Sequence, residues 1–174
     1  ICIRTITLPL VLVLGTRASR RFERALPATA LASYPGSGNT WARALLEAAT
    51  GVLTGSAYVD AALVHAGFLG EGATERVLAV KTHWPWDDDG GLANATLDGL
   101  GGAAAFDRAL VLVRHPYSAI PSLFAYQHTR AHGDEAPEHA WRAWRDRDAR
   151  WRREAARWRR FVRFWRRRFA RARP

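Results

Sequence analysis

The chain has 174 residues, of which 48% are hydrophobic and 24% are charged, so its composition fits one globular domain and excludes a disordered chain. Cys2 is the single cysteine, which excludes an internal disulfide framework and a cysteine-based zinc cluster. The net charge of +10 belongs to one end of the chain, because residues 141–174 hold fifteen arginines and three acidic residues. No methionine is present, even at position 1, and we therefore expect a fragment of a longer protein.

Residues 1–27 are expected to be an N-terminal extension or the remnant of a leader. Their apolar run, Leu8 to Leu14, is shorter than the ~20 residues that cross a bilayer, and Arg17, Arg20 and Arg21 follow it. Two interpretations stay open. Residues 1–14 are either the end of a truncated signal-anchor, which implies a Golgi or other membrane location, or a stray strand or mistranslated leader, which implies a cytoplasmic protein.

The first predicted strand covers residues 28–34 and ends at the turn signal of residues 35–38. A helix is predicted over residues 39–49, and Gly51 is expected to stop it. The spacing of its large apolar residues places them on one face of this helix: Trp41, Leu45 and Leu46.

Two further strands are predicted, over residues 76–81 and 108–113, the second being the strongest in the chain. A helix of about fifteen residues is predicted from Tyr117, and residues 87–105 are expected to form a loop with a weak helix. Strands that are continuous apolar runs and alternate with helices are typical of a parallel sheet. We therefore expect residues 28–174 to be an α/β domain.

Residues 138–170 predict one long amphipathic helix, because tryptophan recurs every seven residues and arginine fills most other positions. The stripe consists of Trp144, Trp151, Trp158 and Trp165. It can pack on the sheet and leave the arginines in solvent, or it can dock on an anionic membrane surface or on nucleic acid.

Three groups of residues carry chemistry. The first is a loop between the first strand and the first helix, made of Gly36, Ser37, Gly38, Asn39, Thr40 and Trp41. Small residues let backbone amides converge at a helix N-terminus, which suits a phosphate group, although a tight turn explains the glycines equally well. The loop is not a Walker A motif, because no Gly-Lys-Ser/Thr follows.

The other two groups follow predicted strands, at the edge where ligands of parallel sheets bind. Lys81 and His83 end the second strand, and His83 is a candidate general base. Arg114 ends the third strand and Ser122 lies eight residues later on the next helix, so that together they could clamp a phosphate. Singly, each of these residues also fits an ordinary structural role.

Together the three groups resemble the sulfotransferases that use 3′-phosphoadenosine 5′-phosphosulfate (PAPS). Residues 33–41 resemble the family's 5′-phosphosulfate loop, residues 81–83 its catalytic strand end, and residues 113–122 its 3′-phosphate motif, including the spacing between Arg114 and Ser122. Residues 49–56 and 67–68 are most similar to the branch with WSC domains. The resemblance covers about residues 28–165.

The resemblance implies a P-loop-like three-layer sandwich and direct in-line transfer of a sulfuryl group from PAPS to an acceptor hydroxyl. His83 would take the acceptor proton, Lys81 and the loop would stabilise charge, and no metal would be needed. The acceptor is expected to be a glycan, a lipid or a small molecule, with no nucleic acid involved. Cytosolic members carry a lysine where this chain has Gly36, which leaves the rate and donor affinity open.

The resemblance further implies that the family's distal strand and a glycine-rich 3′-phosphate segment should follow the long helix. Because the sequence ends at Pro174, we expect a C-terminally truncated domain that is weakly active or inactive. The alternatives are an anionic-surface binding module and a degenerate P-loop nucleotide-binding protein without catalysis.

Overall fold

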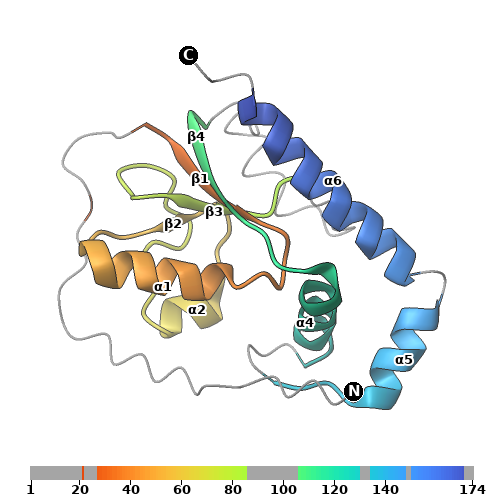
Figure 1. Cartoon of the computed structure of the whole chain (residues 1–174). Coiled ribbons are helices and arrows are strands. Elements are labelled where there is room, and N and C mark those ends of the chain that lie inside the picture. Colours follow the sequence, from red (N-terminus) through yellow and green to blue (C-terminus); the bar gives the residue numbers. More distant parts are fainter. Residues whose placement is uncertain (1–20, 22–26, 86–105, 130–133, 148–149, 171–174) are drawn as a thin grey trace.

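Four parallel strands form the centre of the chain in the computed structural model (Figure 1). The structure describes residues 21, 27–85, 106–129, 134–147 and 150–170. The strands are β1 (Thr29–Ser33), β2 (Gly55–Ser56), β3 (Val80–Thr82) and β4 (Arg108–Leu112), in the order β2-β3-β1-β4. Each neighbouring pair is parallel, which confirms the predicted α/β class with a parallel sheet.

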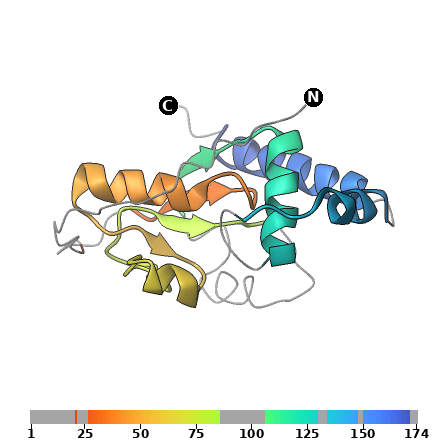
Figure 2. The ribbon, with the colours of Figure 1, turned by 90° about the horizontal axis from the view of Figure 1, so that it is seen from below.

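Five helices are described: α1 (Asn39–Thr50), α2 (Ala61–His65), α4 (Pro116–Thr129), α5 (Glu138–Asp146) and α6 (Arg150–Ala170). In Figure 1, α1 and α2 lie together on one side of the strands, and α6 runs along the other side next to β4. Figure 2 shows α4 standing across the end of the sheet, between the strands and α5. The helices therefore surround a sheet whose two interior strands are β3 and β1.

The main hydrophobic core lies between the sheet and α4 and α6. Side chains alternate along a strand, so Ala30 and Ala32 of β1 point to the same face, where they join Phe161 and Trp165 of α6. Both α6 side chains are about 1% exposed. A second, smaller cluster joins α1 to α2 through Ala44, Leu63 and Phe68.

The second predicted strand is shorter than expected. It begins at Val80, and residues 75–78 form bends instead, with Arg76 in the left-handed region at a φ of 57°. Val77 is nevertheless buried in the main core. The sequence prediction also missed β2 and α2, which are two and five residues long and too short to show a clear hydrophobic period.

The apolar face of α1 does not form its buried side. Trp41 is 57% exposed and Leu45 is 48% exposed, while the charged residues Arg43 and Glu47 are buried. Arg43 donates from Nε to the Thr54 hydroxyl at 2.9 Å and is ion-paired with Glu71. Because these long-range partners satisfy its charge, a polar face turns inward.

The predicted single helix over residues 138–170 is also wrong, since α5 ends at Asp146 and α6 begins at Arg150. Arg147 has extended backbone angles, φ −75° and ψ 129°, which end α5. The tryptophan stripe nevertheless packs inward: Trp144, Trp151 and Trp158 are partly buried against the main core and Trp165 is buried within it.

Some predictions fall outside the described residues. They are the predictions for residues 1–14, for the loop over residues 87–105, and for everything after Ala170. Among the described helices, none combines the length and the apolar character that crossing a membrane requires.

Candidate active site

The glycine loop (residues 35–38) turns the chain sharply from β1 into α1. Gly36 and Gly38 have φ values of 78° and 92°, in the left-handed region that glycine adopts most easily. A Cβ on Gly36 would overlap the carbonyl oxygen of Ala119 and lie 2.9 Å from the nitrogen of Leu123. Glycine is therefore required at position 36 by backbone angle and by the close approach of α4.

The N-terminus of α1 behind this loop has polar groups without partners. Gly38 is the N-cap, and no side chain caps the helix. Two buried atoms here, the hydroxyl of Ser37 and the Oδ1 of Asn39, have no hydrogen-bond partner among the residues that the structure describes. A buried hydroxyl without a partner costs free energy, so a ligand that accepts from Ser37 would relieve that cost. The orphaned Ser37 hydroxyl can donate to a phosphate or sulfate oxygen, whereas Oδ1 of Asn39 is itself an acceptor and would not contribute to anion binding.

Arg114 connects the third group of residues to the loop. Its Nη1 donates to the carbonyl of Gly36 at 2.8 Å, and its side chain is half-buried. A guanidinium has five N–H donors, so this bond leaves others for an anion. Ser122 is half-buried on α4 beside Leu123, whose backbone approaches Gly36. The loop therefore contacts Arg114 and approaches the turn of α4 that carries Ser122.

Helix α6 braces this region from behind. The indole Nε1 of Trp158 donates to the carbonyl of Arg114 at 2.9 Å. The hydroxyl of Tyr34, at the start of the loop, donates to the carboxylate of Glu154 in a buried hydrogen bond. Both ends of the candidate anion site are thus attached to one helix.

His83 follows β3 and is held by the end of β1. Its Nδ1 lies 2.7 Å from the backbone carbonyl oxygen of Ser33 and 3.3 Å from the Ser33 hydroxyl. A carbonyl oxygen only accepts, so Nδ1 carries the proton in this bond and Nε2 keeps its lone pair. Asn39 donates from Nδ2 to the same Ser33 hydroxyl at 3.0 Å, which joins His83 to the start of α1.

The pKa of His83 is lowered from 6.5 to about 3, chiefly by burial and next by the positive charge of Lys81, while its bond to Ser33 opposes the shift. The imidazole is therefore neutral at physiological pH and can accept a proton at Nε2. An anion bound nearby would raise this pKa, because a negative charge favours the imidazolium.

Lys81, predicted to stabilise charge beside the loop, lies in a buried network. It is 7% exposed, and its ammonium lies over the ring of Tyr58, 5.7 Å from the centroid. Burial lowers the pKa of Lys81 below its ordinary value, the charge of Glu71 raises it, and Arg43 lowers it. Within the described residues, its interactions are with this buried network and not with the glycine loop.

The structure thus brings most predicted site residues to one edge of the sheet. The glycine loop, Asn39, His83 and Arg114 are linked by hydrogen bonds through Ser33 and Gly36. Thr40 is half-buried on α1, and Trp41 points to solvent. Sequence reasoning missed Tyr58, which contacts His83, because nothing in its neighbourhood forms a motif.

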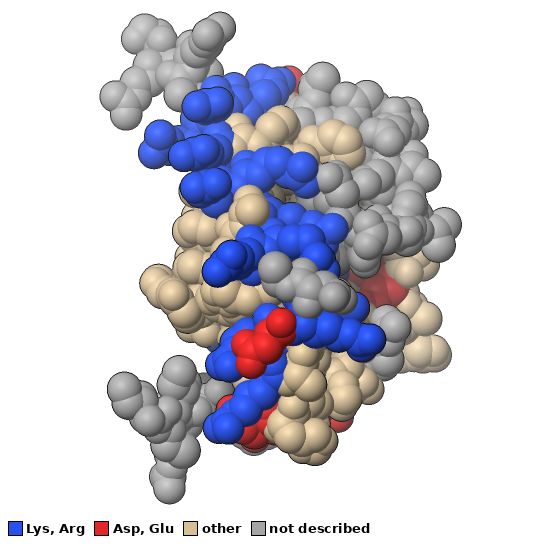
Figure 3. Space-filling model, turned by 90° about the vertical axis from the view of Figure 1, so that its right-hand side faces the viewer, with Lys and Arg blue, Asp and Glu red and all other residues tan. Residues whose placement is uncertain are grey.

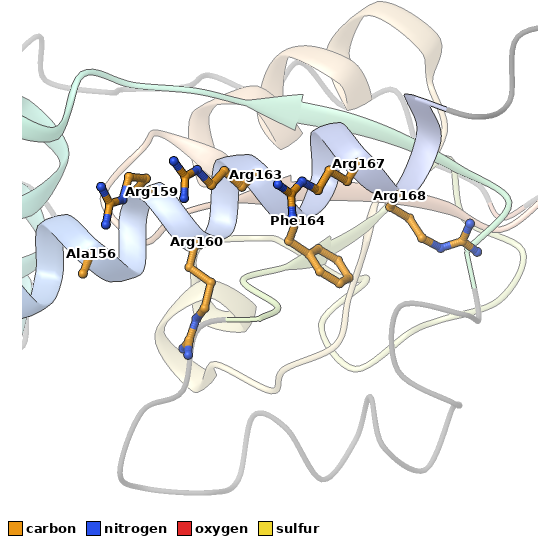
Figure 4. A pocket seen from close by; sticks show the side chains of 7 residues that line it. All are labelled: Ala156, Arg159, Arg160, Arg163, Phe164, Arg167 and Arg168. Atoms are coloured by element: carbon orange, nitrogen blue, oxygen red, sulfur yellow. The ribbon is translucent and has the colours of Figure 1, made fainter.

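A second surface feature is a ridge of exposed arginines on α6, visible as a blue band in Figure 3. A hollow of about 530 Å³ borders part of this ridge. Figure 4 shows Arg159, Arg163 and Arg167 on one side of α6 and Arg160 with Phe164 on the other. Arg160 donates to the carbonyl of Pro85 at 3.3 Å, so the ridge borders the segment that follows His83.

Among the described residues, no group of three or more His, Cys, Asp or Glu side chains is arranged to hold a metal ion. No protein-family model matches the chain, and no solved structure matches it.

Curated relatives are found in insects. The chain is 47% identical over 106 residues to a WSCD family member of Drosophila melanogaster, which covers 60% of this chain and 29% of that protein. It is 48% identical over 100 residues to a WSCD family member of Drosophila pseudoobscura pseudoobscura, covering 57% and 28%. A WSCD family member of Aedes aegypti is 45% identical over 100 residues, covering 57% and 27%. The matched segments thus span less than a third of these relatives, whose names state no reaction.

Proposed function

We propose that this chain is part of a sulfotransferase that moves a sulfuryl group from PAPS to an acceptor hydroxyl. The observation that carries the proposal is the junction of three features at the carboxyl ends of β1, β3 and β4: an uncapped helix N-terminus with a buried, unpartnered Ser37 hydroxyl, a neutral His83, and Arg114. The resemblance to PAPS-dependent sulfotransferases supplies the reaction. The name of the insect relatives neither adds to it nor opposes it.

The proposed fold is a P-loop-like three-layer arrangement. The strand order β2-β3-β1-β4 places β1 in the interior of the sheet, and its carboxyl end leads through the glycine loop into α1. Ligands of open parallel sheets bind outside the carboxyl ends of the strands. This topology supports a donor phosphate at the start of α1.

In the proposed reaction, an oxygen of the acceptor attacks the sulfur of PAPS in line with the leaving phosphate. The new S–O bond forms to the acceptor, the S–O bond to the 5′-phosphate breaks, and the acceptor proton passes to Nε2 of His83. The loop amides and Ser37 would stabilise charge on the sulfuryl and phosphate oxygens. Arg114 would hold the 3′-phosphate, and 3′-phosphoadenosine 5′-phosphate would leave as the product.

The experiment that tests this function measures both binding and transfer. Calorimetry with 3′-phosphoadenosine 5′-phosphate tests the donor site, and labelled PAPS with a panel of glycan, lipid and small hydroxyl acceptors tests transfer. General-base catalysis is worth ~10²–10⁴ in rate, so His83→Ala should lower kcat by about that factor while nucleotide affinity changes little. His65→Ala, at an exposed position on α2, is the matched control and should leave both unchanged.

Binding without transfer to any acceptor would instead support the alternative of a nucleotide-binding protein without catalysis. Absence of binding in a folded chain would contradict both functions.

A second function is favoured by the arginine ridge, and we propose it as an addition: electrostatic binding to an anionic membrane surface. Arg159, Arg163 and Arg167 recur every four residues along one side of α6, about 6 Å apart. Within the described part of the chain, no carboxylate is paired with these three side chains. The apolar face of α6 is buried against the sheet, so attachment would be by charge and not by insertion.

The test of this second function is co-sedimentation with vesicles of phosphatidylcholine, with and without phosphatidylserine. Binding should need the anionic lipid and weaken from low to high salt, since exposed charges are screened. Replacing Arg163 and Arg167 by Glu should abolish it. Equal binding to neutral vesicles, or competition by RNA at the same concentration as lipid, would refute a membrane-specific surface.

A further inference from the structure

Tyr58 lies in the segment between β2 and α2, in contact with the residues that end β3. Its backbone is fixed by two hydrogen bonds, from its own N–H to the Ser56 hydroxyl at 3.1 Å and from the Gly72 N–H to its carbonyl at 2.8 Å. The backbone that carries the aromatic ring is therefore fixed relative to β2 and the sheet.

Tyr58 contacts His83 in two ways. The backbone N–H of His83 donates to the Tyr58 hydroxyl oxygen at 2.6 Å. The imidazole also stacks on the phenol ring, with centroids 5.3 Å apart and an angle of 19° between the planes. The first contact fixes where the backbone of His83 lies, and the second limits rotation of its ring.

The Ser33 carbonyl provides the second restraint on the same imidazole. With Nδ1 donating to this carbonyl at 2.7 Å and one face of the ring against Tyr58, two independent elements define the orientation of the ring. Neither restraint uses Nε2. An imidazole whose one nitrogen is tied to a carbonyl presents the other nitrogen with its lone pair.

Tyr58 also links His83 to the buried charges. The Lys81 ammonium lies 5.7 Å from the centroid of the Tyr58 ring, at a distance where a cation is attracted to an aromatic face. Tyr58 thus contacts both residues of the Lys81–His83 pair. The pKa of Tyr58 is raised, mainly by burial, so its hydroxyl keeps its proton while its oxygen accepts from the His83 amide.

From these contacts we infer, on the basis of the function proposed above, that Tyr58 is a positioning residue. It holds the imidazole of His83 in the orientation in which Nδ1 donates to the Ser33 carbonyl, a bond that sets the tautomer and leaves Nε2 for the acceptor hydroxyl.

Two substitutions separate the contacts. Tyr58→Phe keeps the stacked ring and removes the acceptor of the His83 amide, whereas Tyr58→Leu removes both. The ring is the feature that orients the imidazole, so Tyr58→Phe should keep His83 mostly in its wild-type orientation. Tyr117→Leu is the matched control, because Tyr117 is 65% exposed and stacks on His115 in the same way, with centroids 5.4 Å apart.

The primary measurement is NMR of the imidazole nitrogens of His83 across pH, which needs neither donor nor acceptor. The wild-type chain should show protonated Nδ1, bare Nε2 and a pKa far below 6.5. Tyr58→Leu should show mixed tautomers and a pKa shifted back toward 6.5, with Tyr58→Phe between them and Tyr117→Leu unchanged. A folded Tyr58→Leu chain with the wild-type tautomer and titration would overturn the inference.

The second measurement is transfer kinetics. A misplaced catalytic group can cost about a hundredfold in rate, so Tyr58→Leu should lower kcat by about tenfold to a hundredfold while the KM for PAPS changes less than twofold. An equal change in kcat and in the KM for PAPS would indicate general loss of structure and would contradict a positioning role for Tyr58. If the wild-type chain shows no transfer but the NMR differences appear, the proposed function fails and the positioning of His83 stands.

Discussion

Replacing Arg114 by Ala tests two roles of this residue in the candidate donor site, binding of the 3′-phosphate and support of the glycine loop. In the proposed site Arg114 holds the 3′-phosphate, and in the structure it also donates to the carbonyl of Gly36 at 2.8 Å. The variant would therefore lose a charged contact to the ligand and a support of the loop. The two losses have different sizes and act on different ligands.

The charged contact to the 3′-phosphate should be worth about 2–3 kcal/mol, the range for hydrogen bonds to charged groups. That corresponds to a loss of affinity of roughly 30-fold to 150-fold for 3′-phosphoadenosine 5′-phosphate. Adenosine 5′-phosphate lacks the 3′-phosphate, so its affinity should fall only because the loop is less well supported. For it we expect a loss of about 1 kcal/mol, or roughly fivefold.

The assay is isothermal titration calorimetry of both nucleotides on the wild-type chain, Arg114→Ala and Arg142→Ala. Arg142 is an exposed residue of α5 that pairs with Glu138, so its removal controls for a change in overall charge. Equal losses for the two nucleotides in Arg114→Ala would refute the assignment of Arg114 to the 3′-phosphate. Equal losses in Arg142→Ala would show that only net charge matters.

Three further predictions concern stability. His83 binds a proton in the unfolded chain below pH 6.5 but in the folded chain only near pH 3. The free energy of unfolding should therefore fall by about 1.4 kcal/mol per pH unit as the pH drops between these values. Urea denaturation of the wild-type chain should show this extra slope relative to His83→Gln. Arg43→Met leaves the buried carboxylate of Glu71 without its cationic partner and should cost about 3–5 kcal/mol by the same method. Gly36→Ala should destabilise far more than Gly38→Ala, measured as Tm, because both have positive φ but only Gly36 has no room for a Cβ.

The controls follow from burial. Arg142→Met, at a 67% exposed side chain, should change the free energy of unfolding by less than about 0.5 kcal/mol. A similar effect at Arg43 would mean that the buried network contributes little. Equal Tm values for the two alanine variants of the loop would show that α4 yields easily at Gly36, and an identical pH slope with His83→Gln would mean that His83 titrates normally.

The parts of the fold that were predictable are those specified by neighbouring residues. A run of apolar residues identified β1 and β4, and the Pro-Gly-Ser-Gly turn marked where β1 ends and α1 begins. The same local signals located Arg114 at the end of a strand. Whether these groups meet depends on the order of the strands. The prediction of a parallel sheet limited the possible orders, and the structure shows which one occurs.

The parts that were not predictable depend on residues far apart in the sequence. Arg43 is buried because Thr54 and Glu71 come to it, and hydrophobic periodicity assigns a charged residue to the surface. Tyr58 reaches His83 across 25 positions of chain. The end of α5 at Arg147 falls in a segment whose apolar period continues, so no local signal marked it.

The attachment of Tyr34 and Arg114 to α6 has a thermodynamic consequence. The loop cannot open outward without breaking the bond from Tyr34 to Glu154, and the end of β4 cannot move without breaking the bond from Trp158. Opening of the donor site and undocking of α6 should therefore form one cooperative unit in native-state hydrogen exchange. A nucleotide that binds only the closed loop then protects the amides of α6 as well, by a free energy that grows as RT ln(1 + [L]/Kd) with its concentration.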